Sequence, residues 1–247
     1  MGILNRKNKV AKTQQQDTNN VLNDFMRSFD NVTPVKSKYE IIEEAIANNP
    51  KSSLYRVETQ QTSVHLHTIE VSDFMAKSKK GFIALDLETT GLDNVEDAIV
   101  EIGAVRVRNG AIVEYYHQFI DPEKPMPQSA YEVNGITDAM LCGQPQIYEV
   151  MPDLLDFIGN DIVAAHNVSF DAGFLIQACM RYRFKIHRKY FDTMDLKVYW
   201  PGVKNRKLST FLEAAGIQNN NSHRADGDAE ALARFIIKTC EKVNSIE

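Results

Sequence analysis

Residues 82–92 read FIALDLETTGL, a short apolar run with two acids near its end. The length and apolar character of the run predict a central strand that is buried on both faces. Asp86 and Glu88 stand two positions apart, and such residues point to the same face of a strand. Two like charges at the end of a buried strand are unfavourable unless a cation compensates them. An isolated pair is more often two solvated acids, so a site here requires further residues.

Two later segments carry acids that could join this pair. Asp171 follows a short apolar run at 162–165, and Asp228 lies five positions after His223 at the start of the last expected helix. The carboxyl ends of parallel strands meet at one edge of a sheet, which is where open α/β sheets place their sites. Taken alone, each is an ordinary first-turn aspartate, which the helix dipole favours. Together with the first pair they form a candidate site.

The chemistry of this set points to divalent metal ions. Carboxylate ligands without a cysteine partner favour Mg²⁺ or Mn²⁺. Four carboxylates balance the charge of two such ions, and two ions about 3.5–4 Å apart suit in-line attack of water on a phosphodiester. Histidine ordinarily titrates near pH ~6.5, so His223 is a candidate for the base that takes the proton from that water.

The pattern around these motifs predicts an α/β domain. Asn109-Gly110 is a strong two-residue hairpin signal between two alternating segments. Three antiparallel strands followed by strands separated by helices indicate a mixed five-stranded sheet flanked by helices on both faces. The expected strands are 82–87, 98–108, 111–120, 162–165 and 189–193, and the expected helices are 147–158, 170–182, 208–215 and 225–243.

The first 80 residues differ in character from the rest. Residues 1–20 are polar and are expected to be a disordered tail. Residues 21–80 are expected to form a small N-terminal extension and linker, with a helix opening at Ser37, a strand over Ser63–Val71 and a linker from Lys77 to Gly81. The domain that carries the motifs is expected to span residues 81–247.

Composition excludes several classes of protein. The chain has 247 residues, of which 43% are hydrophobic and 25% charged, as in globular proteins. Its three cysteines lie far apart, so a disulfide framework and a zinc knuckle are not indicated. The net charge is −5, with +3 in residues 1–80 and −8 in residues 81–247. No apolar run reaches the ~18–20 residues of a membrane span, and a cytoplasmic protein is expected.

Taken in order, the three motifs closely resemble those of the DEDDh 3′–5′ exonucleases, the DnaQ-like proofreading type with a ribonuclease H-like fold. The matching segments are DLETTG at 86–91, HNVSFD at 166–171, and His223 with Asp228, and the resemblance runs from about Phe82 to Val243. It implies that two Mg²⁺ or Mn²⁺ ions are held by Asp86, Glu88, Asp171 and Asp228, and that His223 is the general base. The H-x4-D spacing selects Asp228 over Asp226.

The resemblance also implies a substrate-binding set. It places Thr89, Thr90, Gly91 and Leu92 against the terminal nucleotide, and His166, Asn167 and Phe170 beside the substrate strand. The chain departs from the family at Asn134, where a histidine often stands, which puts one minor substrate contact in doubt.

Some neighbouring residues have competing interpretations. For Tyr199-Trp200, packing is favoured over stacking on a base, and for Asp192, helix capping is favoured over metal binding. The basic turn of Lys204, Arg206 and Lys207 is as consistent with phosphate contact as with a solvated turn.

The expected function is metal-dependent 3′–5′ exonuclease activity on single-stranded DNA 3′ ends, releasing 5′-mononucleotides in proofreading or repair. A DNA polymerase or another replication or repair protein is the expected partner, and no membrane is involved. The alternatives are an exoribonuclease of the same superfamily and a non-catalytic module that binds nucleic acid or a polymerase. A haloacid-dehalogenase phosphatase is disfavoured because it needs an aspartate where Glu88 stands.

Overall fold

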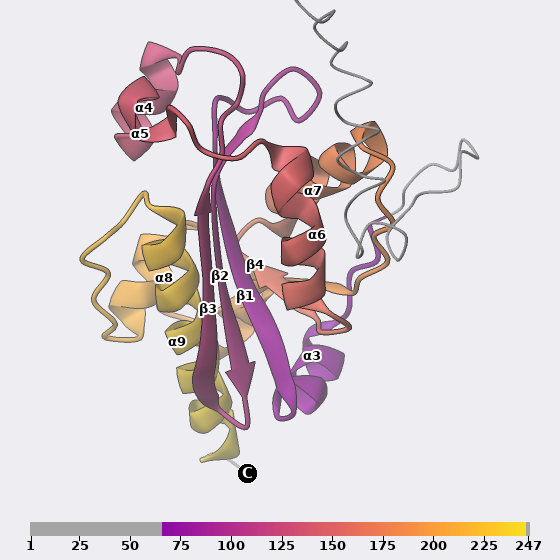
Figure 1. The fold of residues 1–247 in the computed structure, drawn as a ribbon. Coiled ribbons are helices and arrows are strands. Elements are labelled where there is room, and N and C mark those ends of the chain that lie inside the picture. The colour runs from indigo at the N-terminus through magenta and orange to yellow at the C-terminus, as the bar shows by residue number, and fades with distance from the viewer. Residues whose placement is uncertain (1–65, 246–247) are drawn as a thin grey trace, which may run out of the picture. The chain divides into compact units, whose positions relative to one another are not determined.

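The computed structural model describes residues 66–245, which contain one mixed sheet with helices on both faces (Figure 1). The expected tail at 1–20, the helix at Ser37 and most of the N-terminal extension lie outside the described residues. The sheet has five strands, as predicted, and their order is β3-β2-β1-β4-β5. The strands are β1 (Gly81–Thr89), β2 (Ile99–Arg108), β3 (Ala111–Phe119), β4 (Val163–Ala165) and β5 (Tyr190–Asp192).

Strand direction follows the expected pattern. β1, β2 and β3 are antiparallel, whereas β4 pairs parallel to β1 and β5 pairs parallel to β4. The hairpin between β2 and β3 turns at Asn109 and Gly110, which have φ values of 51° and 76°. Positive φ at both central residues matches the twist of the flanking strands, which is why Asn-Gly is a strong hairpin signal. The C-terminal ends of β1, β4 and β5 therefore lie at one edge of the sheet.

Helices cover both faces of this sheet. α6 (Ile147–Ile158) and α7 (Val168–Arg181) lie on one face, and α8 (Leu208–Ala214) and α9 (Ala225–Asn244) lie on the other (Figure 1). Alternation along β2 explains the division, since the Arg106 guanidinium reaches the Phe157 carbonyl of α6 while Gly103 faces α9. The shorter helices are α4 (Gln128–Asn134), α5 (Asp138–Leu141) and the 3₁₀ helix η2 (Thr193–Tyr199).

A glycine on β2 lets the start of α9 come close to the sheet. A Cβ at position 103 would overlap the backbone of Ala225 and Asp226 in the first turn of α9. The apolar side of α9 then continues over the sheet, where Ala229, Leu232 and Phe235 are buried in the main core. The close contact at Gly103 therefore sets where along the strands the first turn of α9 lies, and with it the position of the acids in that turn.

The structure differs from prediction before residue 81. The expected strand over Ser63–Val71 is wrong in its described part, because only an isolated bridge between Thr68 and Tyr190 forms and Val71 begins helix α3 (Val71–Ser78). Phe74 explains the helix, since its ring is fully buried and stacks on Phe191 with centroids 3.8 Å apart. The division of the chain at residue 81 stays a prediction, but α3 packs into the same core as β1.

Among the helices of residues 66–245, none has the length and apolar character needed to cross a bilayer.

Candidate active site

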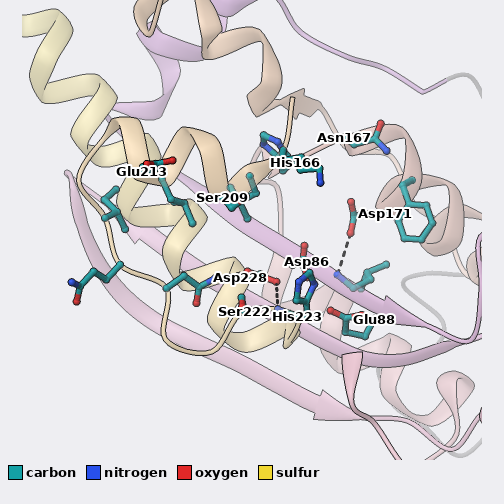
Figure 2. Close-up of a pocket in the computed structure, with 18 of the residues that line it drawn as sticks. Asp86, Glu88, His166, Asn167, Asp171, Ser209, Glu213, Ser222, His223 and Asp228 are labelled. Atoms are coloured by element: carbon teal, nitrogen blue, oxygen red, sulfur yellow. Dashed lines mark hydrogen bonds between the residues drawn. The ribbon is translucent and has the colours of Figure 1, made fainter. Parts of the chain in front are cut away.

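Four acidic side chains from three elements converge at the carboxyl end of β1 (Figure 2). Asp86 and Glu88 come from β1 and Asp228 from the first turn of α9, and one carboxylate oxygen of each lies within 4.8 Å of the others. Asp171, in the first turn of α7, accepts a hydrogen bond from the Leu87 amide at 3.1 Å, between the two β1 acids. These four residues are referred to below as the acid cluster.

Local structure explains how each acid reaches the cluster. The two β1 acids share a face because they are two residues apart on a strand. Asn167 turns the chain between β4 and α7 with a left-handed φ of 71°, which puts Asp171 on the first turn beside β1. Asp228 is held by the His223 amide, which donates to it at 2.9 Å, and by the side chain of Asn219.

The acids of the cluster hold protons more tightly than isolated carboxyls. Burial raises the pKa of Asp86 well above its usual value, and repulsion from Asp171, Asp228 and Glu88 adds to it. Burial is likewise the main cause of the raised pKa of Asp171 and of Asp228. Burial raises the pKa of Glu88 to about 7, against a lowering hydrogen bond from Asn134. A set of buried carboxylate oxygens that repel one another fits hard divalent cations such as Mg²⁺ or Mn²⁺.

These shifts predict a pH-dependent stability that a divalent cation should remove. A carboxyl whose pKa is raised on folding stabilises the folded state at low pH, and this contribution is lost as the pH rises through the raised value. For Glu88 this stabilisation is lost between pH 4.5, the ordinary pKa of a glutamate side chain, and about pH 7, its raised pKa. We expect the unfolding free energy in EDTA to fall by roughly 3 kcal/mol across this window because of Glu88.

Urea unfolding at pH 5 and pH 8, with EDTA or with Mg²⁺, measures this effect. Mg²⁺ should stabilise the protein much more at pH 8 than at pH 5. The variant Glu88→Gln should show a smaller decline in EDTA, whereas Asp226→Asn should keep the full decline. A metal-free stability that rises between pH 5 and pH 8 would contradict the assignment of the acid cluster.

His223 lies beside the acid cluster in the loop that precedes α9. Its side chain is exposed and its backbone has a left-handed φ of 61°. Figure 2 shows its ring next to Asp86 and Asp228. The hydrogen bond from its own amide to Asp228 ties the position of this imidazole to that of the cluster.

A buried network that sequence reasoning missed fixes the same loop. Glu101 is fully buried on β2, directly opposite Glu88 in the strand register. Its carboxylate accepts from the Arg224 guanidinium at 2.8 Å, from the Ala225 amide at 3.1 Å and binds His117 at 2.7 Å. Burial alone would raise the pKa of Glu101, but these donors outweigh burial and lower it. The hydrogen bonds to Glu101 therefore fix the positions of Arg224 and Ala225, the two residues that follow His223.

One feature of the sequence could have revealed the hydrogen-bond network of Glu101. Glu101 is the single charged residue in the buried run IVEIGAV at 99–105, and a charge in such a run requires a partner. Its partner Arg224 lies 123 residues later, so the pairing itself could not be read from spacing.

The residues expected to meet the terminal nucleotide form the turn after β1. The Thr89 hydroxyl donates to the Gly91 carbonyl at 2.5 Å, and the Thr90 hydroxyl donates to Asp97 at 3.1 Å. A Cβ at Gly91 would overlap the Asp97 carboxylate, so a side chain at position 91 would displace the Asp97 side chain. Leu92 is 87% exposed, and of these four side chains it is the one available to a ligand as an apolar surface. Their substrate role stays a prediction.

His166 is held in the structure at both ring nitrogens. Nδ1 lies 3.0 Å from the Thr193 hydroxyl and Nε2 lies 2.7 Å from the Arg206 carbonyl. Burial lowers the pKa of this imidazole, which favours the neutral ring. His166 therefore ties the basic turn at 204–207 to the end of β4.

A cavity of about 870 Å³ joins these groups. Its walls include the acid cluster and Lys207 of the basic turn. They also include the three residues expected beside the substrate strand, His166, Asn167 and Phe170. Ser209 and Glu213 of α8 line its far side (Figure 2). The cavity is large enough for a nucleotide unit.

The remaining sequence interpretations can be placed as well. Trp200 is buried and donates from Nε1 to Thr239 at 3.0 Å, which is the favoured packing role. Asp192 caps η2 by accepting from the Met194 amide at 2.9 Å, as expected. Asn134 is buried beside Glu88, and its side chain accepts from the Ile136 amide at 3.0 Å.

Comparison with known proteins gives a consistent result. The model of the exonuclease family RNase_T matches residues 83–236. The chain is 38% identical over 156 residues to a DNA polymerase III PolC-type protein of Clostridium perfringens, and 38% identical over 160 residues to that of Bacillus subtilis. These matches cover 63% and 64% of this chain but 11% of each relative, so the chain spans about a ninth of their length.

Solved structures with the same fold include two exonucleases. Exonuclease X, in complex with 5′ overhanging duplex DNA, is 27% identical with a TM-score of 0.54, and the match covers 66% of this chain and 92% of that one. The E. coli ExoI–ssDNA complex is 17% identical with a TM-score of 0.59, covering 68% of this chain and 41% of that one, which shows the fold alone.

The sheet order, the motifs and the family match over residues 83–236 agree, and the chain belongs to the DnaQ-like RNase_T exonuclease family.

Proposed function

We propose that this protein is a metal-dependent 3′–5′ exonuclease that releases 5′-mononucleotides from single-stranded DNA ends. The observation that carries the proposal is the convergence of Asp86, Glu88 and Asp228 within 4.8 Å, with Asp171 bound to the Leu87 amide between the two β1 acids. The hydrogen bond from the His223 amide to Asp228 supports the inclusion of this histidine in the site.

The residues divide the chemistry between them. The acid cluster would hold two divalent ions, which supply activation of water and stabilisation of the leaving oxygen when bound. His223 takes the proton from the attacking water at its imidazole nitrogen, and its exposed position lets it pass that proton to solvent. The ion pair between Glu101 and Arg224 holds the loop that carries His223 beside the carboxyl end of β1. Phe170 lines the cavity, and the exposed side chain of Leu92 would contact the terminal nucleotide.

The comparisons favour DNA over RNA as the substrate. The curated relatives are named as DNA polymerases, and the structure of Exonuclease X contains duplex DNA. We extend this to a role in proofreading or repair beside a DNA polymerase or another replication protein in the cytoplasm. The exoribonuclease and the non-catalytic module become outcomes of the test.

Digestion of end-labelled strands tests the proposal directly. Matched DNA and RNA oligonucleotides, labelled at the 5′ or the 3′ end, are incubated with Mg²⁺ or with EDTA. With Mg²⁺, 3′-labelled DNA should release labelled mononucleotide at once, while 5′-labelled DNA shortens stepwise. Faster digestion of RNA would replace the substrate assignment, and intact strands under all conditions would leave only a binding role.

A further inference from the structure

The segment that joins α7 to β5 is strongly basic on an otherwise acidic domain. Residues 181–189 carry five Lys/Arg residues, and no acid occurs between Asp171 and Asp192. Residues 81–247 as a whole have a net charge of −8. Positive charge concentrated in one segment of an acidic domain is the electrostatic signature of a site for an anionic partner.

Buried aromatic and exposed basic side chains alternate along the first part of this segment. Tyr182, Phe184 and Tyr190 are buried, whereas the alternate residues Arg183 and Lys185 are exposed. The Phe184 amide donates to the Cys179 carbonyl at 2.9 Å, and the ring of Tyr182 packs on Tyr148 of α6. The buried aromatic side chains thus anchor the segment, while Arg183 and Lys185 lie at its surface.

The first end of this segment is bonded to the loop between β1 and β2. Arg181 donates from Nη2 to the Val95 carbonyl at 2.7 Å, in the loop that follows the Thr89–Leu92 turn. Along α7, Asp171 and Arg181 are ten residues apart, which is about 15 Å at 1.5 Å per residue. The same length corresponds to about four or five nucleotides at 3.4 Å per nucleotide of a B-form strand.

The far end of the segment faces a carboxylate. Lys189 is close enough to Asp73 of α3 to help lower its pKa, so part of its charge is compensated. Arg183 and Lys185 are exposed and lie nearer to α7, so they are the cations chosen for the test.

We propose that residues 181–189 form a basic strip that binds the backbone of the nucleic acid a few nucleotides upstream of the 3′ end held at the acid cluster. This inference rests on the proposed function, because the substrate strand must leave the cleft and is itself a polyanion. The strip contacts phosphates, so it strengthens binding without selecting a base sequence.

Salt dependence measures such contacts. Each phosphate neutralised on a single strand contributes about 0.7 to the slope of log K against log salt. In the variant Arg183→Asn/Lys185→Gln, where asparagine suits the left-handed φ of 60° at position 183, this slope should fall by about 1.4 for a strand of roughly 20 nucleotides. The KM of that strand should rise about tenfold at low salt, with kcat unchanged. A trinucleotide should be digested as before.

The control removes two charges elsewhere. Lys79→Gln/Lys80→Gln changes two exposed lysines beside the start of β1, at the opposite end of that strand from its acids. It should leave the slope and the KM unchanged. Equal losses in both double variants, an unchanged slope in the strip variant, or an equal loss on the trinucleotide would each overturn the strip.

Measuring strand binding by fluorescence anisotropy in an Asp86→Asn background separates this inference from the proposed function. Turnover is absent there, so a slope that depends on the strip supports the strip even if the wild-type protein proves inactive. If the salt slope of binding is the same with and without the charges of the strip, the strip is refuted. The proposed exonuclease function would not be affected by that result.

Discussion

Replacement of Asp86 by asparagine should reduce the rate of phosphodiester hydrolysis at least about a thousandfold. Asp86 is the most central acid of the cluster, because it is repelled by Asp171, Asp228 and Glu88 together. The amide keeps the size of the side chain but removes the charge that two divalent ions require. EDTA should abolish the wild-type rate to the same extent, and added Mg²⁺ or Mn²⁺ should restore it. Initial rates on a 3′-labelled strand measure both effects.

A neighbouring aspartate offers a matched control. Asp226 lies two residues before Asp228 on α9, but its carboxylate accepts from the Asn221 side chain at 3.0 Å and the Gly227 amide at 2.8 Å. Asp226→Asn should therefore retain activity within a few fold. A slow Asp226→Asn beside an active Asp86→Asn would show that the ions are held elsewhere.

Replacement of His223 by glutamine should slow the chemical step by about 10²–10⁴-fold, the usual contribution of a general base. The loss should appear in kcat and leave the KM of the strand nearly unchanged, because the imidazole acts on the water. Stabilisation of the variant by Mg²⁺ at pH 8 should persist, since the four acids are intact. Single-turnover rates and urea unfolding measure the two properties separately.

The histidine at position 67 provides the comparison for this variant. His67 is exposed, and its backbone carbonyl accepts a hydrogen bond from the Tyr190 amide at 2.9 Å. His67→Gln should therefore be as active as the wild type. If His223→Gln keeps the full rate, another group accepts the proton and the role of His223 is limited to its amide.

The local pattern was sufficient for most elements of the nuclease fold. The helix predicted at 147–158 has those bounds, and the hairpin at Asn109-Gly110 forms as predicted. Both depend on short-range rules, namely helical periodicity and the positive φ of a tight turn. The strand expected at Ser63–Val71 fails because burial of Phe74 against Phe191, 117 positions further along the chain, favours helix α3 there.

The sequence by itself determined the five strands of the sheet, the acid motifs and the family, because each strand and each motif is formed by residues within a few positions of one another. Tertiary structure alone decided how the site is held. Glu101 meets Arg224 across 123 residues, and His166 meets the Arg206 carbonyl across 40. These contacts depend on which strands lie next to each other in the sheet and on the close approach of α9 to Gly103. Neither can be read from the spacing of residues along the sequence.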